Sequence, residues 1–326
     1  MIIPTLRISE KKDYDKMMEE FFKWDIKLLR VNFTRYSMAR YIEDVLYIKQ
    51  QMGQSIGIMA DLPIPGRKYR TLIPSGEILI NQGEKITFVP FNHQCGDKTI
   101  LVDTNSFVET KDTMKILIGD GELTFTTLQV EKDKIVAEAE NTGVIRGGRA
   151  FILNGNMRYK KYDTDMMQEY LDGMKAISPQ KLVLSFAEDN NVLLEIAEEF
   201  RKVIPEAEIV PKIETQVGID NCDVIMKSFK TIMLGRGDLG LFSDIKAFGM
   251  NQNYVLDRGI LNDVNVIVAT DILTSLYEST VPVRGELTDI YYLKEKKVKD
   301  IVVSAGISLY PKLFARFMDI VEDDFK

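Results

Sequence analysis

Hydrophobic and polar positions follow two different periods in the N-terminal part of the chain. Residues 2–8 and 26–33 are short apolar runs of the kind that form buried strands. In residues 11–24 the apolar side chains recur every three or four positions, as they do along one face of a helix. Residues 37–51 repeat the helical period and residues 55–60 the strand pattern. The sequence therefore begins with a repeated strand–helix unit.

The middle of the chain has a different character. Between residues 66 and 154 glycines are frequent, and short runs such as residues 134–138 alternate with a period of two. Turn sequences such as GDGE at residues 119–122 separate these runs. This pattern predicts an all-β segment.

The strand–helix pattern returns after residue 155. The predicted elements are helix 164–176, strand 181–186, helix 191–203, strand 208–213, helix 218–227, strand 231–234, helix 245–261, strand 264–269, strand 300–304 and helix 311–322. Eight parallel strand–helix units favour a closed barrel over an open sheet. We therefore predict an α/β protein whose (β/α)8 barrel comprises residues 1–65 and 155–326. A small, β-barrel-like lid domain of residues 66–154 is inserted after the third strand.

Composition excludes several classes of function. The 326 residues carry a formal charge of −7, which disfavours nucleic-acid binding. There is no secretory signal and no apolar stretch long enough to span a bilayer. The two cysteines, Cys95 and Cys222, have no disulfide or metal-site spacing, so we expect a cytoplasmic protein. The single histidine, His93, lies in a polar run and is expected in a solvated loop.

Polar residues gather where the predicted barrel strands end, and barrel enzymes carry out their chemistry at that face. The strand-end residues are Arg30, Asn32, Thr34, Asp61, Lys212, Glu214, Asp238 and Thr270. Taken singly, Lys212 with Glu214 is compatible with a salt bridge and Asp238 with a helix cap. Together they indicate a site, because buried charges cost folding energy unless they are paired or bound to metal. Carboxylates without histidine suit Mg²⁺ or Mn²⁺, and nearby cations suit phosphoryl transfer.

The sequence TIMLGRGDLG also fits a dinucleotide fingerprint through Gly235, Gly237 and Gly240. Asp238 argues against that interpretation, because a carboxylate inside the turn repels a pyrophosphate unless a metal cation lies between them.

Several motifs resemble those of the pyruvate kinase family. They are RVNFT (30–34), MADLPIP with Arg70 (59–70), PKIETQVGIDNCDVI (211–225), IMLGRGDLG (232–240), VIVATDIL (266–273), VPVRGELTDI (281–290) and, in the inserted segment, IGDGEL and NTGVIRGG. The similarity runs over nearly the whole chain in the same order.

The resemblance implies roles for the strand-end residues. Glu214 and Asp238 would bind the divalent metal, and Lys212 would neutralise the transferring phosphoryl group and stabilise an enolate. Arg30 would hold the phosphate. Thr270 would lie near the substrate carboxylate and the proton donor. The implied reaction moves phosphoryl from phosphoenolpyruvate to ADP in glycolysis, releasing ATP and pyruvate.

Further ligands follow from the same resemblance. Gly237 would help to bind the substrate carboxylate through backbone N–H groups at a helix N-terminus. Arg70, Asn32 and Arg149 would contact the nucleotide, Arg149 standing where the family usually has lysine.

The resemblance also bears on a monovalent cation. Asn32, Thr34 and Asp61 match the family's K⁺ ligands, with Thr34 in place of serine. Lys68 stands where K⁺-independent members carry lysine, so its ammonium would substitute for the ion.

The chain departs from the family pattern at several positions. Arg35 and Tyr36 replace His-Gly, Glu188 replaces an arginine, and the sequence SAGIS at 304–308 lacks a glutamate. The family's C-terminal effector domain would be absent. A homo-oligomer remains compatible with the resemblance, although the sequence identifies no interface.

Three functions therefore stay open. The first is the phosphoenolpyruvate–ADP phosphotransferase. The second uses the same metal and lysine with another acceptor, or for lyase chemistry on a 2-oxo acid. The third is a non-catalytic paralogue that binds phosphoenolpyruvate.

Overall fold

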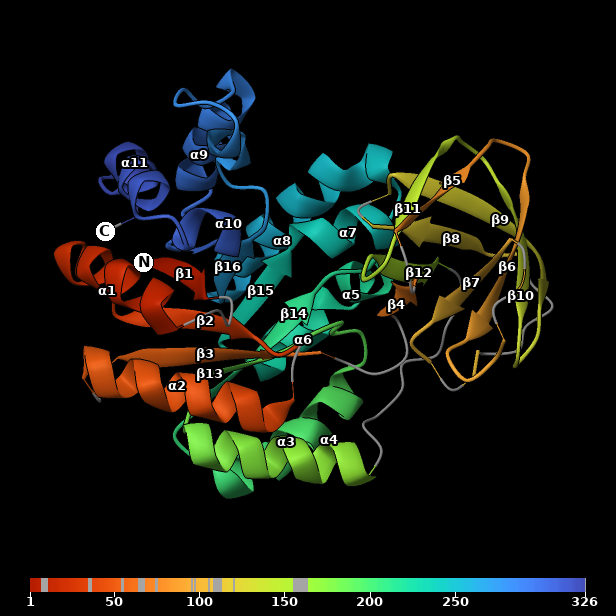
Figure 1. Ribbon diagram of the computed structural model, residues 1–326. Coiled ribbons are helices and arrows are strands. Elements are labelled where there is room, and N and C mark those ends of the chain that lie inside the picture. Colours follow the sequence, from red (N-terminus) through yellow and green to blue (C-terminus); the bar gives the residue numbers. More distant parts are fainter. Residues whose placement is uncertain are drawn as a thin grey trace. The chain divides into compact units, whose positions relative to one another are not determined.

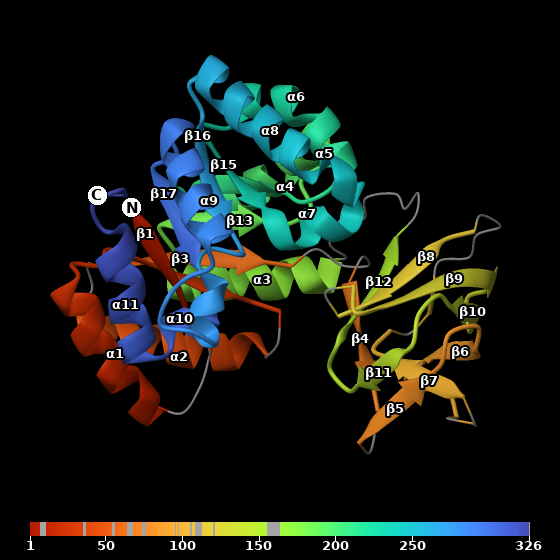
Figure 2. The same cartoon turned by 90° about the horizontal axis from the view of Figure 1, so that it is seen from above.

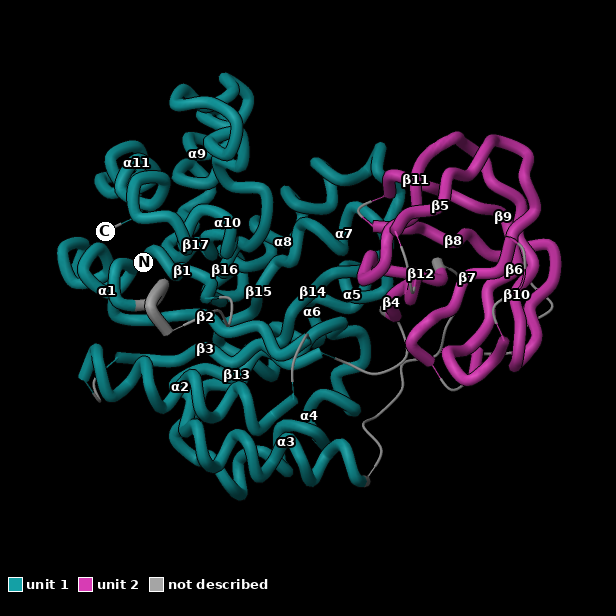
Figure 3. Tube along the Cα trace, viewed as in Figure 1, with its two compact units in different colours: residues 1–64, 161–326 teal, residues 65–160 magenta. Residues whose placement is uncertain are grey.

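The computed structural model describes residues 1–6, 11–34, 37–53, 56–63, 68–73, 76–94, 96, 98–104, 106–107, 113–119, 121–154 and 164–325. The chain forms two compact units, one of residues 1–64 and 161–326 and the other of residues 65–160 (Figure 3). Arg35 and Tyr36, which distinguish this chain from the family pattern, lie outside the described residues, as does the side chain of Lys68.

The first unit is a closed parallel barrel, as the strand–helix alternation predicts. Its strands follow the order β1-β17-β16-β15-β14-β13-β3-β2. Their bounds are β1 Ile2–Leu6, β2 Leu28–Asn32, β3 Gly57–Leu62, β13 Lys181–Leu184, β14 Glu208–Ile213, β15 Thr231–Gly235, β16 Asn265–Ala269 and β17 Asp300–Val303. The barrel closes where β1 pairs with both β17 and β2.

Helices surround this barrel (Figures 1 and 2). They are α1 Lys11–Lys23, α2 Met38–Met52, α3 Thr164–Ile177, α4 Asn190–Val203, α5 Gln216–Asp220, α6 Cys222–Ser228, α7 Arg236–Phe242, α8 Phe248–Asn262, α9 Arg284–Glu295, α10 Ala305–Ser308 and α11 Pro311–Val321, with 3-10 turns η1 Ile245–Ala247 and η2 Thr274–Tyr277. Helix α4 illustrates their origin. The Asp189 side chain caps it by accepting from two backbone N–H groups, and Leu193, Ile196, Ala197 and Phe200 form its buried stripe.

Each barrel strand contributes an apolar side chain to a central layer. These residues are Ile3, Leu28, Met59, Val183, Val210, Met233, Ile267 and Val302, joined by Ala269. Strands that are covered on both faces read as continuous apolar runs, and this accounts for the strength of the strand pattern in the sequence.

The second unit is all-β, as expected. Seven of its described strands close a barrel in the order β10-β6-β7-β4-β12-β8-β9, and β5 pairs with β11 in a separate ribbon. The bounds are β4 Lys68–Leu72, β5 Glu77–Ile80, β6 Lys85–Pro90, β7 Thr99–Val102, β8 Lys115–Ile118, β9 Leu123–Val130, β10 Ile135–Ala139, β11 Gly143–Arg146 and β12 Ala150–Asn154. In its core the ring of Phe88 packs 5.4 Å from Phe125 and 5.0 Å from Phe151, centroid to centroid. His93 is exposed in a turn, which confirms the solvated-loop prediction.

Local boundaries differ from the prediction in several places. Strand β3 runs to Leu62, so Asp61 lies inside the strand. Strand β13 stops at Leu184, and Phe186 beyond it has a φ of 52°. The single helix predicted at 218–227 is two helices that meet at Asn221, whose side chain donates to the carbonyl of Glu188. Helix α9 was not predicted from the sequence. In the part of the chain that the structure describes, no helix is long and apolar enough to cross a membrane.

Candidate functional site

A layer of polar side chains lies at the C-terminal end of the barrel interior. Strand side chains alternate between faces, so the residue two positions after a core residue points to the same side. Applied to five strands, this rule places Thr5, Arg30, Asp61, Ser185 and Lys212 beyond the apolar layer. Hydrogen bonds among all five residues are consistent with this arrangement. The two-residue period of the strands therefore brings these five polar residues together in one cluster.

Asp61 is the centre of this cluster and is only 1% exposed. Its Oδ2 accepts from Arg30 Nε at 2.9 Å and from Arg30 Nη2 at 2.6 Å. Lys212 Nζ lies 3.0 Å from both carboxylate oxygens, and Ser185 Oγ donates to Oδ1 at 3.1 Å. Arg30 also donates through Nη1 to Thr5 Oγ1 at 3.1 Å. One buried carboxylate thus holds two cations in fixed positions.

Lys212 connects this cluster to Glu214. Its Nζ is 3.2 Å from Glu214 Oε1, and the two residues are 7% and 3% exposed. The other carboxylate oxygen, Oε2, accepts from the backbone N–H of Phe186 at 3.0 Å. The positive φ of Phe186 belongs to the tight turn that aims this N–H at Glu214.

The charges shift the pKa values of these groups. Burial opposes ionisation of Asp61, but the charges of Lys212 and Arg30 outweigh it and lower the pKa of Asp61. Burial also disfavours the ammonium of Lys212, yet Asp61 and Glu214 together raise its pKa above the ordinary value. Burial raises the pKa of Glu214 to about 7, with Asp238 and Asp61 adding to the increase and Lys212 opposing it. Glu214 is therefore a carboxylate whose charge is only partly compensated.

Glu214 and Asp238 together fit a divalent cation. Asp238 lies in the first turn of α7, where it adds negative charge to the surroundings of Glu214. Asp238 is not the N-cap residue of α7, because Gly235 occupies that position and the helix begins at Arg236. Within the described residues no group of three or more histidines, cysteines and carboxylates could hold a metal. Two carboxylates suit Mg²⁺ or Mn²⁺, which keep waters and take substrate oxygens as further ligands.

The glycines of GRGDLG allow the segments around this site to approach closely. A Cβ on Gly235 would lie 2.8 Å from Glu214 Oε1, and one on Gly237 would lie 2.9 Å from Thr270 Cγ2. Thr270 is exposed and has a φ of 79°, which a β-branched residue rarely adopts. Close approach and strain at one place are typical of a functional site.

The residues predicted to bind a monovalent cation are only partly described. Asn32 Oδ1 is buried without a hydrogen-bond partner among the described residues, and an orphaned carbonyl oxygen of this kind suits a cation. Thr34 is exposed. Asp61 already accepts from Arg30, Lys212 and Ser185.

Arg70 and Arg149, the predicted nucleotide ligands of the inserted segment, lie in the second unit. Arg70 on β4 pairs in register with Ala150 at the start of β12, next to Arg149. Arg70 Nη1 donates to the carbonyl of Gly148 at 2.9 Å, and Arg149 pairs with Glu122. The strand pairing brings these two arginines together.

Three residues of the site region were not predicted from the sequence. Thr5 and Ser185 would have followed from the two-residue rule, because each comes two positions after a core residue. Arg236 lies inside the quoted glycine motif but was assigned no role. Its buried side chain donates to the backbone carbonyls of Thr270 and Asp271.

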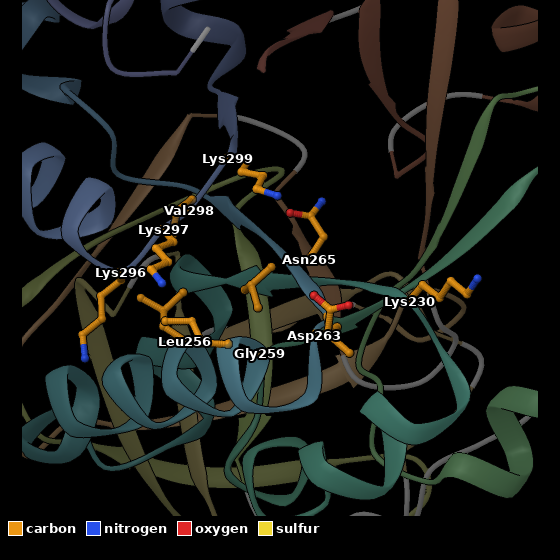
Figure 4. Close-up of a pocket in the computed structure, with 12 residues that line it drawn as sticks. Lys230, Leu256, Gly259, Asp263, Asn265, Lys296, Lys297, Val298 and Lys299 are labelled. Carbon is orange, nitrogen blue, oxygen red and sulfur yellow. The ribbon is translucent and has the colours of Figure 1, made fainter.

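A second feature lies at the other end of the same barrel. A hollow of about 370 Å³ is formed at the N-terminal ends of β15, β16 and β17 (Figure 4). Lys230, Lys296, Lys297 and Lys299 line it together with Asp263. Lys296 is already paired with Asp257 at 2.6 Å. This hollow belongs to the face that serves stability in barrel enzymes and contains none of the predicted site residues.

Comparison with known proteins identifies the family. A family model described as the barrel domain of pyruvate kinase matches residues 1–293. The chain belongs to the pyruvate kinase family. Pyruvate kinases similar to it come from Pyrobaculum aerophilum, 25% identical over 77% of this chain and 54% of the relative, and from Thermoplasma acidophilum, 25% identical over 94% and 55%. The cytosolic isozyme of Nicotiana tabacum is 26% identical over 84% of this chain and 56% of its own length. The chain thus spans slightly more than half the length of these pyruvate kinases.

Proposed function

We propose that this member of the pyruvate kinase family transfers phosphoryl from phosphoenolpyruvate to ADP, with Mg²⁺ or Mn²⁺ held by Glu214 and Asp238. The observation that carries the proposal is the buried ammonium of Lys212, held between Asp61 and Glu214 at 3.0 and 3.2 Å. A cation fixed in advance stabilises charge that develops during reaction without having to reorganise.

In the proposed reaction the bond between phosphorus and the enol oxygen breaks, and a bond to an ADP β-phosphate oxygen forms. The electron pair of the broken bond stays on the enol oxygen and gives the enolate of pyruvate. The cationic side chains of Lys212 and Arg30, which Asp61 holds in place, are proposed to stabilise this negative charge. A bound divalent cation would supply further positive charge to the phosphoryl oxygens and the enolate oxygen. The enolate then takes a proton at its methylene carbon, on the side where Thr270 is proposed to lie.

The substrate carboxylate is proposed to bind between Thr270 and the first turn of α7. Backbone N–H groups in a first helical turn have no intrahelical partner, so Gly237 and Asp238 offer donors there. The absent side chain of Gly237 leaves the Thr270 methyl group close beside them.

Arg70, Arg149 and Asn32 are proposed to contact the nucleotide. We also propose that Asn32, Thr34 and Asp61 are the ligands of any bound monovalent cation, and that Lys68 makes the activity independent of K⁺. We also propose that the reaction takes place in the cytoplasm.

The test is a lactate dehydrogenase-coupled assay with phosphoenolpyruvate, Mg²⁺ and ADP on the wild type and on Lys212→Met. Lys181→Met is the matched control. Lys181, like Lys212, pairs with a glutamate, in this case Glu208, but it lies at the N-terminal end of β13. We expect ADP-dependent pyruvate release that Lys212→Met abolishes and Lys181→Met retains.

Other results would favour the other two functions. Pyruvate release from oxaloacetate without ADP, dependent on metal and Lys212, would indicate lyase chemistry. Metal-dependent binding of phosphoenolpyruvate without turnover of any acceptor would indicate a binding protein.

A further inference from the structure

Arg236 occupies an unusual position beside the candidate site. It is the first residue of α7 and is 4% exposed. Its Nε donates to the carbonyl of Thr270 at 2.9 Å and its Nη2 to the carbonyl of Asp271 at 2.7 Å. Its Nη1 donates to Asp289 Oδ2 at 2.7 Å and lies 3.4 Å from Gln252 Oε1. Gln252 on α8 and Asp289 on α9 thus position the guanidinium, which donates hydrogen bonds to the turn after β16.

The turn that Arg236 grips is strained. Thr270 and Asp271 have φ values of 79° and 56°, in the left-handed region that residues other than glycine rarely adopt. Such conformations persist only where the surrounding structure enforces them. The planar fork of a guanidinium can bond two successive carbonyls at once, which an ammonium cannot reproduce with the same geometry.

The backbone of Arg236 leads directly into the other side of the proposed carboxylate site. Gly237 and Asp238 follow it in the first turn of α7, and Gly237 approaches Thr270 too closely to admit a Cβ. One residue therefore ties the two segments together, through its backbone on one side and its side chain on the other.

We infer that Arg236 is a positioning residue for the substrate carboxylate: it holds the Thr270 turn against Gly237 and so keeps both halves of that subsite at a fixed separation. This inference rests on the proposed function, which assigns the substrate carboxylate to these residues. Arg236 does not itself touch the substrate in this account. Displacement of a binding group by about 1 Å can cost roughly a hundredfold in rate, so loss of the grip is measurable.

The experiment compares Arg236→Lys with the wild type and with Arg258→Lys. Arg258 on α8 is the matched control because it also pairs with an aspartate, Asp223, but this pair joins α8 to α6. Two quantities are measured: the Mn²⁺-dependent affinity for oxalate, a small dianion resembling the enolate of pyruvate, and the KM values for phosphoenolpyruvate and ADP. Oxalate binding requires no phosphate acceptor, so it tests the subsite even where turnover is absent.

We expect Arg236→Lys to weaken oxalate binding and raise the KM for phosphoenolpyruvate by about tenfold to a hundredfold. The KM for ADP should stay within about twofold, and Arg258→Lys should match the wild type. Unchanged oxalate affinity in a folded Arg236→Lys protein would overturn the inference. An equal loss of kcat with no change in either KM would also overturn it, because that is the result of a smaller folded fraction.

A second variant covers the case in which Arg236→Lys does not fold. Asp289→Asn keeps the guanidinium and both carbonyl bonds but weakens its anchor on α9. We expect a smaller loss of oxalate affinity, of about threefold to tenfold, since a charged hydrogen bond is replaced by a neutral one. An Asp289→Asn protein with wild-type oxalate affinity would contradict the inference. A wild type that binds oxalate with Mn²⁺ but forms no ATP would refute the proposed function and leave the oxalate comparison as the test of Arg236.

Discussion

Replacement of Asp61 by asparagine tests whether one buried carboxylate organises the site. Asp61 accepts from Arg30, Lys212 and Ser185 and is nearly inaccessible to solvent. Asparagine keeps the shape of the side chain but removes the charge and turns an N–H₂ group toward neighbouring donors. Lys212 would then keep only Glu214 as a carboxylate partner, and Arg30 would lose its ion pair.

The size of the effect follows from the burial. Removing one partner of a buried ion pair costs about 3–5 kcal/mol, because the other charge is left without compensation. We expect a value near 3 kcal/mol, because Lys212 keeps its contact with Glu214 at 3.2 Å. For a domain of this size that corresponds to a decrease in Tm of roughly 6–12 °C.

The pH dependence gives a second check. Because the folded pKa of Asp61 is depressed below 3.8, its contribution is complete above that pH and is lost as the pH falls through the folded pKa. In urea unfolding the difference between the wild type and Asp61→Asn should nevertheless decrease between pH 5 and pH 8, because the charge of Asp61 also raises the pKa of Glu214 and the wild type therefore loses more stability as Glu214 ionises.

The control for this prediction is Asp223→Asn, which breaks the partly exposed pair with Arg258. Exposed pairs contribute at most about 1 kcal/mol. If Asp61→Asn cost no more than this control, the account of Asp61 as the buried centre of the site would be wrong.

Three further predictions concern the metal, the glycine turn and the monovalent cation. Burial raises the pKa of Glu214 from 4.5 to about 7, so the metal-free protein should lose roughly 3 kcal/mol of stability as the pH rises through this range. Added Mn²⁺ should raise Tm most above pH 7. Calorimetry that shows no such pH trend would contradict the assignment of Glu214 as a metal ligand. Gly237→Ala should raise the KM for phosphoenolpyruvate at least tenfold because its Cβ would press on Thr270, whereas Gly285→Ala, with open space around its Cβ, should not; equal KM values would count against close approach at this turn. Activity should be the same in K⁺ and in tetramethylammonium, and Lys68→Glu should make it depend on K⁺; a wild type that requires K⁺ would disprove the role given to Lys68.

Much of this fold could be predicted from the sequence because its main signals are local. Strands buried on both faces and helices with one apolar stripe leave separate periods, and their alternation is enough to predict the barrel. The polar strand ends at Arg30, Asp61 and Lys212 were visible for the same reason. The two-residue spacing from Leu28, Met59 and Val210 also places these polar side chains beyond the core layer.

The remaining features depend on contacts between distant residues. Lys212 meets Asp61 across 151 positions of sequence, and no local pattern records that pairing. The carbonyl of Thr270, whose backbone has a positive φ, accepts a hydrogen bond from Arg236, which lies 34 positions away. The division of the predicted helix at Asn221 likewise reflects a side-chain bond to Glu188 on another segment.

Phosphoryl transfer from phosphoenolpyruvate to ADP can be followed directly at the phosphorus atoms. Wild-type protein is mixed with phosphoenolpyruvate, ADP and Mg²⁺, and ³¹P NMR spectra are recorded with time. We expect the phosphoenolpyruvate resonance to decline as the γ-phosphate resonance of ATP grows in equal amount. A phosphoenolpyruvate signal that persists, or one that is replaced by inorganic phosphate without ATP, would contradict the proposed transfer.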